Sequence, residues 1–246
     1  MIQSAQRRIV AVGGGGFLLD DTRFLQEAYL KSLCRTTQPR VLFLGTAAGD
    51  SERAQLKFYR AFTELGCRLS TLAFFPFDMR RDYAAAALEA DLIYVGGGNT
   101  VAMLAVWHEF GFDAVLRQAY EAGTVLAGIS AGANCWFEHY ITDSIPGGGT
   151  QAGLGLLPGT FCPHLDSETW RQPMLAATQG LAAGAGENVC VLYENEQWVE
   201  AVQDRPATLA GGPLCMRRSA DAASNAALEH ATMRPLQPAP TMKDGN

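Results

Sequence analysis

The stretch Gly128-Ile129-Ser130-Ala131-Gly132 has the residue types of a serine nucleophile held on a sharp turn. It follows the apolar run Thr124-Val125-Leu126-Ala127, which predicts a buried strand that enters the turn and continues as a helix. Glycines on both sides let the backbone pass closely, so the Ser130 hydroxyl would project from the turn. The same pattern also occurs in turns that only pack a helix on a strand, so both readings stand at this point.

A serine hydroxyl becomes a good nucleophile only when a base accepts its proton, and histidine is the usual base. Of the four histidines, His108 lies toward the end of the helix after Gly96–Thr100, a turn or more from any strand end, and His230 lies in a polar C-terminal segment. His139 is nine residues past Ser130, at the far end of the helix expected there, and should point away from the serine. His164 lies in the proline-stiffened loop Phe161-Cys162-Pro163-His164-Leu165-Asp166. We therefore expect His164 to be the base; the alternative is an ordinary histidine of a surface loop.

The third member of such a site is a carboxylate that orients the imidazole. Asp166 is so near His164 in sequence that it would hardly reach around the ring. Asp143 lies in the loop after the predicted helix, and Glu187 lies in Gly186-Glu187-Asn188, directly before a strand. The pattern of residues does not rank Asp143 and Glu187.

Two further glycine-rich turns follow apolar runs, at Gly13-Gly14-Gly15-Gly16 and at Gly96-Gly97-Gly98-Asn99-Thr100. Neither has the lysine and hydroxyl of a P-loop or the third small residue of a dinucleotide fingerprint, so no nucleotide cofactor is expected. The second turn suits a different purpose, because a backbone without side chains can present its amides to a developing negative charge.

Short apolar runs alternate with segments of helical periodicity from residue 9 to residue 127. This alternation predicts an α/β fold whose mainly parallel sheet is flanked by helices on both faces, with the ligand site beyond the carboxyl ends of the strands. After residue 136 the pattern loosens, and a hairpin with its turn at 194–197 is the last clear feature. The predicted strands are 9–12, 40–44, 69–75, 92–95, 124–127, 189–193 and 198–202, and the predicted helices are 22–34, 51–65, 83–90, 101–107 and 113–121.

The composition describes an ordinary globular protein of 246 residues with 48% hydrophobic and 18% charged residues. We expect one α/β domain over residues 1–217 and a largely polar segment over 218–246 that is disordered in its last ten or so residues.

The net charge of -6 argues against nucleic acid as a partner. No apolar run is long enough for a membrane span or a signal peptide, so a cytoplasmic location is expected, and a homodimer is permitted. The six cysteines are scattered without a C-x-x-C pair, so no metal site is expected.

Several stretches together resemble the peptidase E family, the serine-dependent aspartyl dipeptidases. They span about residues 9 to 216, and their order and combination are more specific than any single motif. The first set is Val95-Gly96-Gly97-Gly98-Asn99-Thr100, Gly128-Ile129-Ser130-Ala131-Gly132-Ala133-Asn134, Pro163-His164 and Ala210-Gly211-Gly212-Pro213. Stretches that resemble a peptidase E-like branch are Thr46-Ala47, Cys135-Trp136-Phe137-Glu138, Thr142-Asp143-Ser144, Gly153-Leu154-Gly155-Leu156-Leu157-Pro158-Gly159 and Phe161-Cys162-Pro163-His164.

The resemblance implies a fold similar to class I glutamine amidotransferases, with Ser130 as the nucleophile on a strand-to-helix elbow and His164 as the general base. Glu187 matches the place of the family's third triad member, with a looser match around it, and Asp143 stays in reserve. The amides of Gly98 and Ala131 would form the oxyanion hole, and no metal or organic cofactor is implied.

The resemblance also implies cleavage after an N-terminal aspartate, which would require a cation for the substrate carboxylate. Arg171, seven residues after His164, is the candidate by proximity, and the alternative is a solvated surface arginine. Gly97 and Asn99 are expected to line the substrate site. Two alternatives remain: a serine esterase or amidase of other specificity on the same fold, and a non-catalytic module that binds a small molecule. A glutaminase is disfavoured because those enzymes use cysteine where this elbow carries serine.

Overall fold

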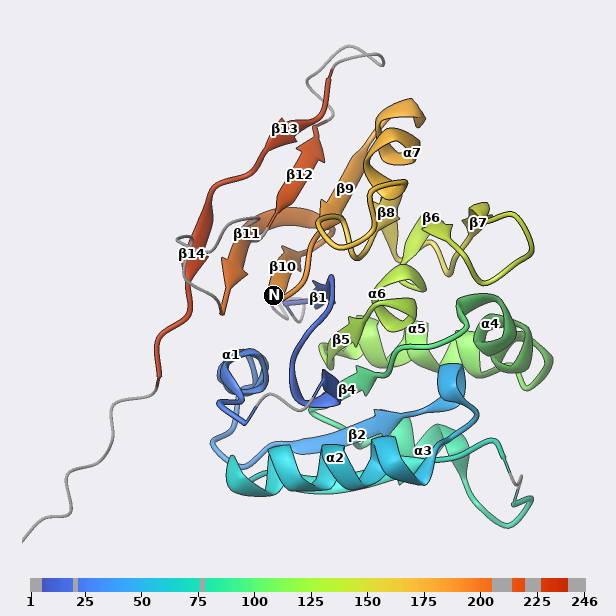
Figure 1. The fold of residues 1–246 in the computed structure, drawn as a ribbon. Helices are drawn as coiled ribbons and strands as arrows, with labels where there is room; N and C mark the ends of the chain where they lie inside the picture. The colour runs from blue at the N-terminus through green and yellow to red at the C-terminus, as the bar shows by residue number, and fades with distance from the viewer. Residues whose placement is uncertain (1–5, 20–21, 76–77, 205–213, 220–226, 239–246) are drawn as a thin grey trace, which may run out of the picture.

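The strands of the chain form two sheets that meet near the middle of the molecule (Figure 1). The structure, a computed structural model, describes residues 6–19, 22–75, 78–204, 214–219 and 227–238. The first sheet has eight strands and the second has six. The expected α/β architecture, with parallel strands at its centre and helices on both faces, is confirmed.

The first sheet contains the five parallel strands that the apolar runs predict, in the order β1-β5-β4-β2-β3. Beyond β1, the strands β10 and β11 continue the sheet as an antiparallel hairpin, and the short strand β14 pairs in parallel with β11. The turn of the hairpin is at Asn195 and Glu196, as predicted, and both have positive φ. The strands are β1 (Arg8–Val12), β2 (Arg40–Leu44), β3 (Arg68–Leu72), β4 (Leu92–Val95), β5 (Val125–Ile129), β10 (Val189–Glu194), β11 (Gln197–Gln203) and β14 (Met233–Pro235).

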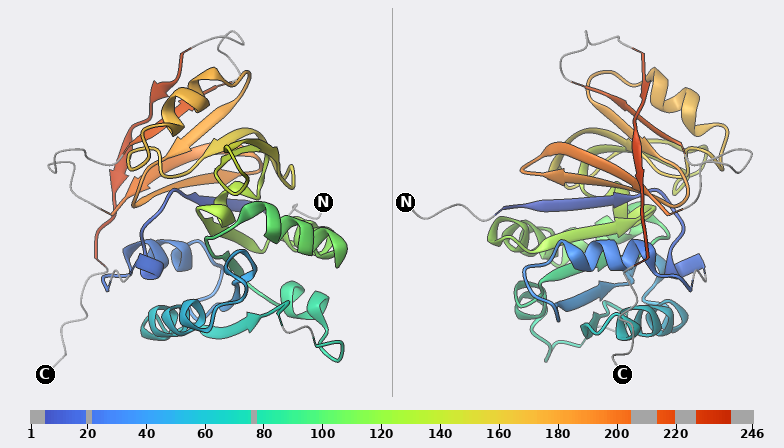
Figure 2. Two further views of the ribbon diagram at one scale, coloured as in Figure 1. Left: turned by 45° about the vertical axis from the view of Figure 1, so that its right-hand side comes forward. Right: turned by 90° about the vertical axis from the view of Figure 1, so that its left-hand side faces the viewer.

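Both faces of the inner strands of the first sheet, β1, β2, β4, β5 and β10, are buried, which explains why these strands are continuous apolar runs in the sequence. In β1, Ile9 and Ala11 belong to one hydrophobic cluster and Val10 and Val12 to the other. The helices α1 and α2 cover the second of these faces, and α3, α4 and α5 cover the first (Figure 2). The helices are α1 (Leu25–Ser32), α2 (Glu52–Glu64), α3 (Tyr83–Leu88), α4 (Thr100–Glu109) and α5 (Phe112–Ala122); single 3-10 turns are η1 (Phe17–Leu19) and η2 (Thr46–Ala48).

The second sheet was not predicted. Its order is β13-β12-β9-β8-β6-β7, and α7 packs against it over a small cluster that includes Cys162, Leu165 and Leu175. Several of its strands consist of small or polar residues, and polar residues, glycine or proline interrupt β6 and β8, so they lack the apolar runs that marked the first sheet. The elements are β6 (Phe137–Thr142), β7 (Gly149–Ala152), β8 (Leu157–Cys162), α7 (Arg171–Ala177), β9 (Ala182–Ala185), β12 (Cys215–Arg218) and β13 (Glu229–His230).

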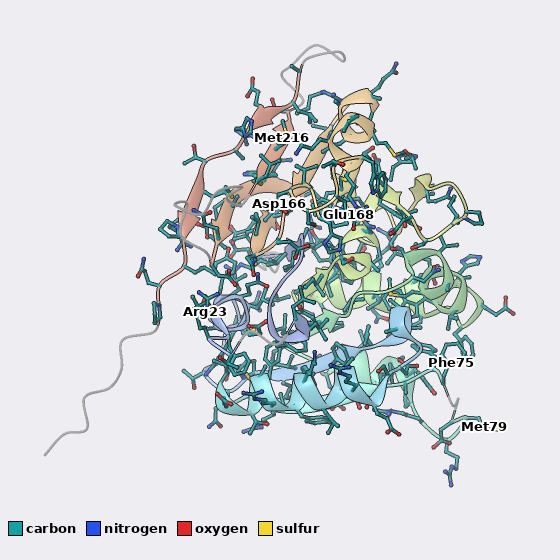
Figure 3. The ribbon with its side chains drawn as sticks, viewed as in Figure 1. Arg23, Phe75, Met79, Asp166, Glu168 and Met216 are labelled. Carbon is teal, nitrogen blue, oxygen red and sulfur yellow. The ribbon has the colours of Figure 1, made fainter. Side chains whose placement is uncertain are left out.

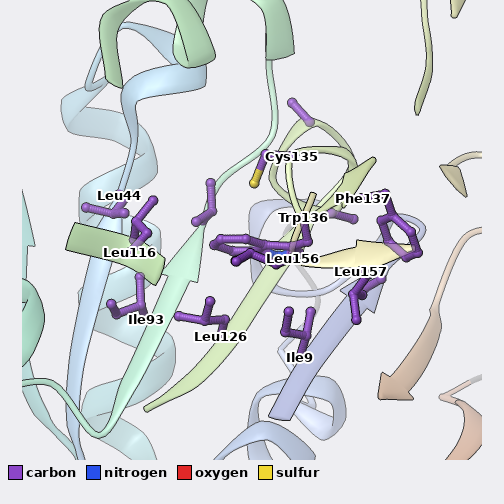
Figure 4. Packing of buried hydrophobic residues seen from close by; sticks show 14 of the residues in the cluster. Ile9, Leu44, Ile93, Leu116, Leu126, Cys135, Trp136, Phe137, Leu156 and Leu157 are labelled. Atoms are coloured by element: carbon purple, nitrogen blue, oxygen red, sulfur yellow. The ribbon is translucent and has the colours of Figure 1, made fainter. Parts of the chain in front are cut away.

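The helix after Ser130 is shorter than expected. It is a single turn, α6 (Ala131–Asn134), after which the chain enters β6 and so passes from the first sheet to the second. Trp136, at this crossing, is fully buried and packs among Leu126, Leu156 and Ile9 (Figure 4). A buried indole placed so soon after the turn anchors the chain in the core, and a longer helix would move it away.

Two short strands lie in the segment after residue 217: β13 pairs with β12, and β14 pairs with β11. The division at residue 217 stays a prediction. Most of the last ten residues, and the stretch Ala210-Gly211-Gly212-Pro213, lie outside the described residues. Within the part of the chain that the structure describes, no helix has the length and apolar character to cross a membrane.

Candidate active site

Ser130 occupies a strained turn between β5 and α6. Its φ of 54° and ψ of -111° are rare for a residue other than glycine, and strain of this kind gathers at functional sites. The turn is possible because of its two glycines: a Cβ on Gly128 would lie 2.1 Å from the Gly132 carbonyl oxygen, and a Cβ on Gly132 would lie 2.3 Å from the Val95 carbonyl oxygen. The Ser130 amide donates to the Val12 carbonyl at 3.0 Å, which fixes the turn to β1.

His164 follows β8 of the second sheet and reaches Ser130 across the junction of the sheets. Its Nε2 lies 2.8 Å from Ser130 Oγ, and its Nδ1 lies 2.5 Å from Glu187 Oε1. A carboxylate can only accept, so Nδ1 carries the proton in this arrangement and Nε2 is free to accept from the serine hydroxyl. The His164 and Glu187 side chains are about a fifth exposed, at 21% and 23%, so the pair is partly shielded from water.

Glu187 lies where the chain passes from β9 in the second sheet to β10 in the first. Its Oε1 also accepts from Ser167 Oγ at 3.1 Å, and its backbone amide donates to Asp166 Oδ1 at 2.8 Å. Asp166 lies with Glu168 on the loop between β8 and α7 (Figure 3). This loop therefore supplies both the histidine and two polar groups that hold the glutamate.

The glycine loop, residues Gly13–Gly16 after β1, packs directly on the glutamate, a role that the sequence analysis missed. A Cβ on Gly14 would lie 2.0 Å from Glu187 Oε2, and the Gly13 carbonyl accepts from the His164 amide at 3.2 Å. Because these residues have no side chains, the Glu187 carboxylate can lie directly against the loop backbone, where a nucleotide-binding loop would instead hold a phosphate. The signal was in the sequence, as a glycine run at a strand end, but its partner lies more than 170 residues away.

The second glycine-rich turn faces the serine. A Cβ on Gly97 would lie in van der Waals contact with Ser130, 3.4 Å from its Cβ and 3.9 Å from its Oγ, so the backbone of this turn passes directly beside the serine. Gly98 has a φ of 139°, and a Cβ there would lie 2.2 Å from the Ala47 carbonyl oxygen. Among the described residues the Gly98 amide has no hydrogen-bond partner in the protein, and Ala131, as the first residue of α6, has no helical acceptor for its amide.

Asn99, expected in the substrate site, caps α4 with its side chain. Its Oδ1 accepts from the Ala102 amide at 2.8 Å, and its Nδ2 donates to the Ser144 carbonyl at 3.1 Å. Ser144 Oγ in turn accepts from the Thr100 amide at 3.1 Å. Ser144, which the sequence analysis named within a family-like stretch but gave no role, thus fastens the glycine-rich turn to the loop after β6.

Asp143 and Arg171 form an ion pair with each other, and neither is among the hydrogen-bond partners of His164 described above. The Arg171 side chain is 3% exposed, and its guanidinium binds Glu168 Oε2 at 2.9 Å, donates to the Ile141 carbonyl at 3.2 Å, and lies 4.4 Å from the Trp170 ring centroid. Asp143 lies 3.5 Å away at the outer side of this cluster, with its side chain 67% exposed. The structure thus brings together Ser130, His164 and Glu187, and places the reserve carboxylate beside the arginine.

The other three histidines lie elsewhere. His108 is an exposed residue of α4 beside Asp113, His139 is on β6 rather than on a helix, and His230 is on β13. Within the described ranges no group of three or more histidine, cysteine or acidic side chains could hold a metal ion.

Comparison with known proteins gives one consistent family. The model of peptidase family S51 matches residues 9–208. The chain is 40% identical over 204 residues to "Uncharacterized peptidase YgaJ" of Bacillus subtilis (strain 168), a match that covers 81% of this chain and 88% of that protein.

Two solved structures share the fold. A peptidase from an acI-B1 Actinobacterium has a TM-score of 0.67 at 18% identity, covering 94% of this chain and 96% of its own. A Listeria monocytogenes EGD-e protein, named "Putative Peptidase E Protein", has a TM-score of 0.64 at 17% identity, covering 82% and 100%. With the family match over most of its length, the chain belongs to peptidase family S51 and is a serine peptidase.

Proposed function

We propose that Ser130, His164 and Glu187 form a catalytic triad that hydrolyses short peptides through an acyl-enzyme. The observation that carries this proposal is the position of the His164 ring, 2.8 Å from Ser130 Oγ on one side and 2.5 Å from Glu187 Oε1 on the other. Each group then has the partner that its role requires: the nucleophile has a base, and the base has an orienting carboxylate.

The reaction begins when Ser130 Oγ attacks the peptide carbonyl and its proton passes to His164 Nε2. The tetrahedral intermediate collapses, the leaving amine takes the proton from Nε2, and an acyl ester remains on Ser130. Water then attacks the ester, gives a proton to Nε2, and the proton returns to Ser130 Oγ as the acid product leaves. Glu187 stabilises the imidazolium that exists in both halves of the reaction.

The amides of Gly98 and Ala131 are proposed as the oxyanion hole. Gly98 is exposed and follows Gly97, whose backbone passes beside Ser130, whereas the amides of Gly96 and Asn99 in the same turn already donate to the Leu44 and Ala47 carbonyls. Two amides fixed by the surrounding backbone could stabilise the oxyanion without reorganising during the reaction.

Dipeptides with an N-terminal aspartate are the proposed substrates, on the family resemblance. Arg171 is the proposed cation, yet its guanidinium is already occupied by Glu168, Asp143 and Trp170. For Arg171 to bind a substrate carboxylate, the exposed Asp143, the longer of its two ion pairs at 3.5 Å, would have to give way. The substrate would then replace one carboxylate by another without leaving the buried arginine unpaired.

The test is a panel of Asp-, Glu-, Leu- and Ala-p-nitroanilides and the matching dipeptides, assayed with wild-type protein and Ser130→Ala. Asp-restricted turnover that disappears in Ser130→Ala is the expected result. Labelling of Ser130 by a fluorophosphonate without turnover of the panel would leave an esterase or amidase of another specificity; no labelling would contradict the triad.

Asp143→Asn provides a specific test of the aspartate subsite. If Asp143 competes with the substrate for Arg171, this variant should lower KM for Asp substrates and leave KM for Ala substrates unchanged. An unchanged KM for both would remove Arg171 from the substrate site and leave it a purely structural residue.

A further inference from the structure

We propose that Gln26 and Glu27 of α1 are positioning residues that hold the glycine loop against Glu187, and so set the contact between Glu187 and His164. This inference rests on the proposed triad. It concerns two buried polar residues and a glycine motif that the reaction itself does not use.

Gln26 and Glu27 are unusual in being polar and charged yet only 1% exposed. Both are in the first turn of α1 and both point at the glycine loop. Gln26 Nε2 donates to the Gly14 carbonyl at 3.3 Å, and Glu27 Oε1 accepts from the Phe17 amide at 3.0 Å. Burying such groups is costly unless they are bonded, so these contacts fix where α1 and the loop lie relative to each other.

The loop fits closely between α1 and the catalytic side chains. A Cβ on Gly16 would lie 2.6 Å from Glu27 Oε1 and 2.8 Å from Gln26 Oε1. On the opposite side, a Cβ on Gly14 would lie 2.0 Å from Glu187 Oε2, and one on Gly15 would lie 2.3 Å from Asn188 Oδ1. The backbone of the glycine loop thus lies between the side chains of Gln26 and Glu27 on one side and the Glu187 carboxylate on the other.

The same loop also touches the histidine and the residue after the glutamate. The Gly13 carbonyl accepts from the His164 amide at 3.2 Å, and the Gly14 carbonyl accepts from the Asn188 amide at 2.9 Å. Gly14 O is therefore shared by Gln26 from one side and Asn188 from the other. A shift of the loop would move the backbone on both sides of the hydrogen bond between Glu187 and His164.

Gln26→Met is the decisive variant, because it keeps the length of the side chain and removes the donor to Gly14 O. Tyr29→Phe is its matched control: it removes one hydrogen bond from the same helix, that of Tyr29 to Glu200 Oε1 at 3.0 Å, on the side facing β11. Glu27→Ala and Glu27→Gln form a second pair, since glutamine keeps an oxygen for the Phe17 amide and alanine does not.

Two measurements distinguish a failure of this proposal from a failure of the proposed catalytic triad. The first is the rate at which a fluorophosphonate labels Ser130. The second is the far-downfield proton resonance of a histidine Nδ1–H bonded to a carboxylate, assigned to His164 by its loss in His164→Gln; the chain has only four histidines, which keeps the spectrum simple.

In Gln26→Met and Glu27→Ala we expect the His164 resonance to move upfield and labelling to slow about tenfold, as small misplacements of catalytic groups do. Tyr29→Phe and Glu27→Gln should match the wild type. An unchanged resonance in Gln26→Met, or an equal change in Tyr29→Phe, would overturn the positioning role. A wild type that is never labelled at Ser130 would defeat the triad instead, while the resonance would still decide whether Gln26 positions the pair.

Discussion

His164 Nδ1 and Glu187 Oε1 lie 2.5 Å apart although the two residues follow different strands of the second sheet, β8 and β9. Ser130, which His164 contacts on its other side, follows β5 of the first sheet. The site therefore lies at the junction of the two sheets, and its geometry depends on how they are joined.

Glu187→Gln should lower kcat by on the order of 10³- to 10⁴-fold, because an amide can hold the imidazole in the wrong tautomer and cannot stabilise its cation. Asp143→Asn is the control and should leave kcat on an uncharged substrate within about twofold. Steady-state kinetics on both variants would decide between the two carboxylates; a larger loss in Asp143→Asn would reverse the assignment.

Ser144→Ala should lower kcat about tenfold with little change in KM, because the Thr100 amide would lose its acceptor and the Gly98 turn would be held less firmly. Ser144→Thr keeps a hydroxyl and should restore activity. The measurement is kcat beside the affinity of a peptide aldehyde, which depends on the oxyanion hole; equal affinity in all three proteins would refute the idea.

Arg171→Met should reduce the free energy of unfolding by about 2 kcal/mol, because Glu168 would lose its charged partner and keep, among the described residues, only the Trp170 indole as a donor. Arg117→Met is the control, since Arg117 is an exposed residue of α5 whose guanidinium donates to the Leu154 carbonyl. Urea denaturation should show a change below about 0.5 kcal/mol for this second variant. Equal losses in the two would mean that the Arg171 cluster contributes no special stability.

The cysteines of the folded protein should resist alkylation at pH 8. Burial raises the pKa of the Cys34, Cys162 and Cys215 thiols to about 12, so only about one in 10⁴ is a reactive thiolate at that pH. Burial also raises the pKa of Cys135, five residues after Ser130, well above its ordinary value.

Iodoacetamide followed by mass spectrometry should find these four thiols unmodified until the protein unfolds, and their labelling should speed up as the pH rises. Rapid labelling of Cys135 in the native protein would contradict the structure. It would also reopen the question of a cysteine nucleophile.

The sequence by itself determined the strands of the first sheet other than β14, and the strand-to-turn form around Ser130. Strands buried on both faces need continuous apolar runs, so β2 (Arg40–Leu44) and β4 (Leu92–Val95) were predicted at their observed ends. The glycines around Ser130 reflect close backbone contacts with β4 and α6, and these requirements are local enough to be read from the residue types.

Only the tertiary structure decided which distant groups meet. The second sheet brings His164 and Glu187 to Ser130, and its strands carry no continuous apolar run: β7 and β9 consist of small and polar residues, and polar residues, glycine or proline interrupt β6 and β8. The purpose of the glycine loop was hidden for the same reason: a glycine run shows that something approaches the backbone closely, but not that the approaching group is the carboxylate of Glu187. Arg171 likewise could be read as free for a substrate until folding placed Glu168 and Asp143 beside it.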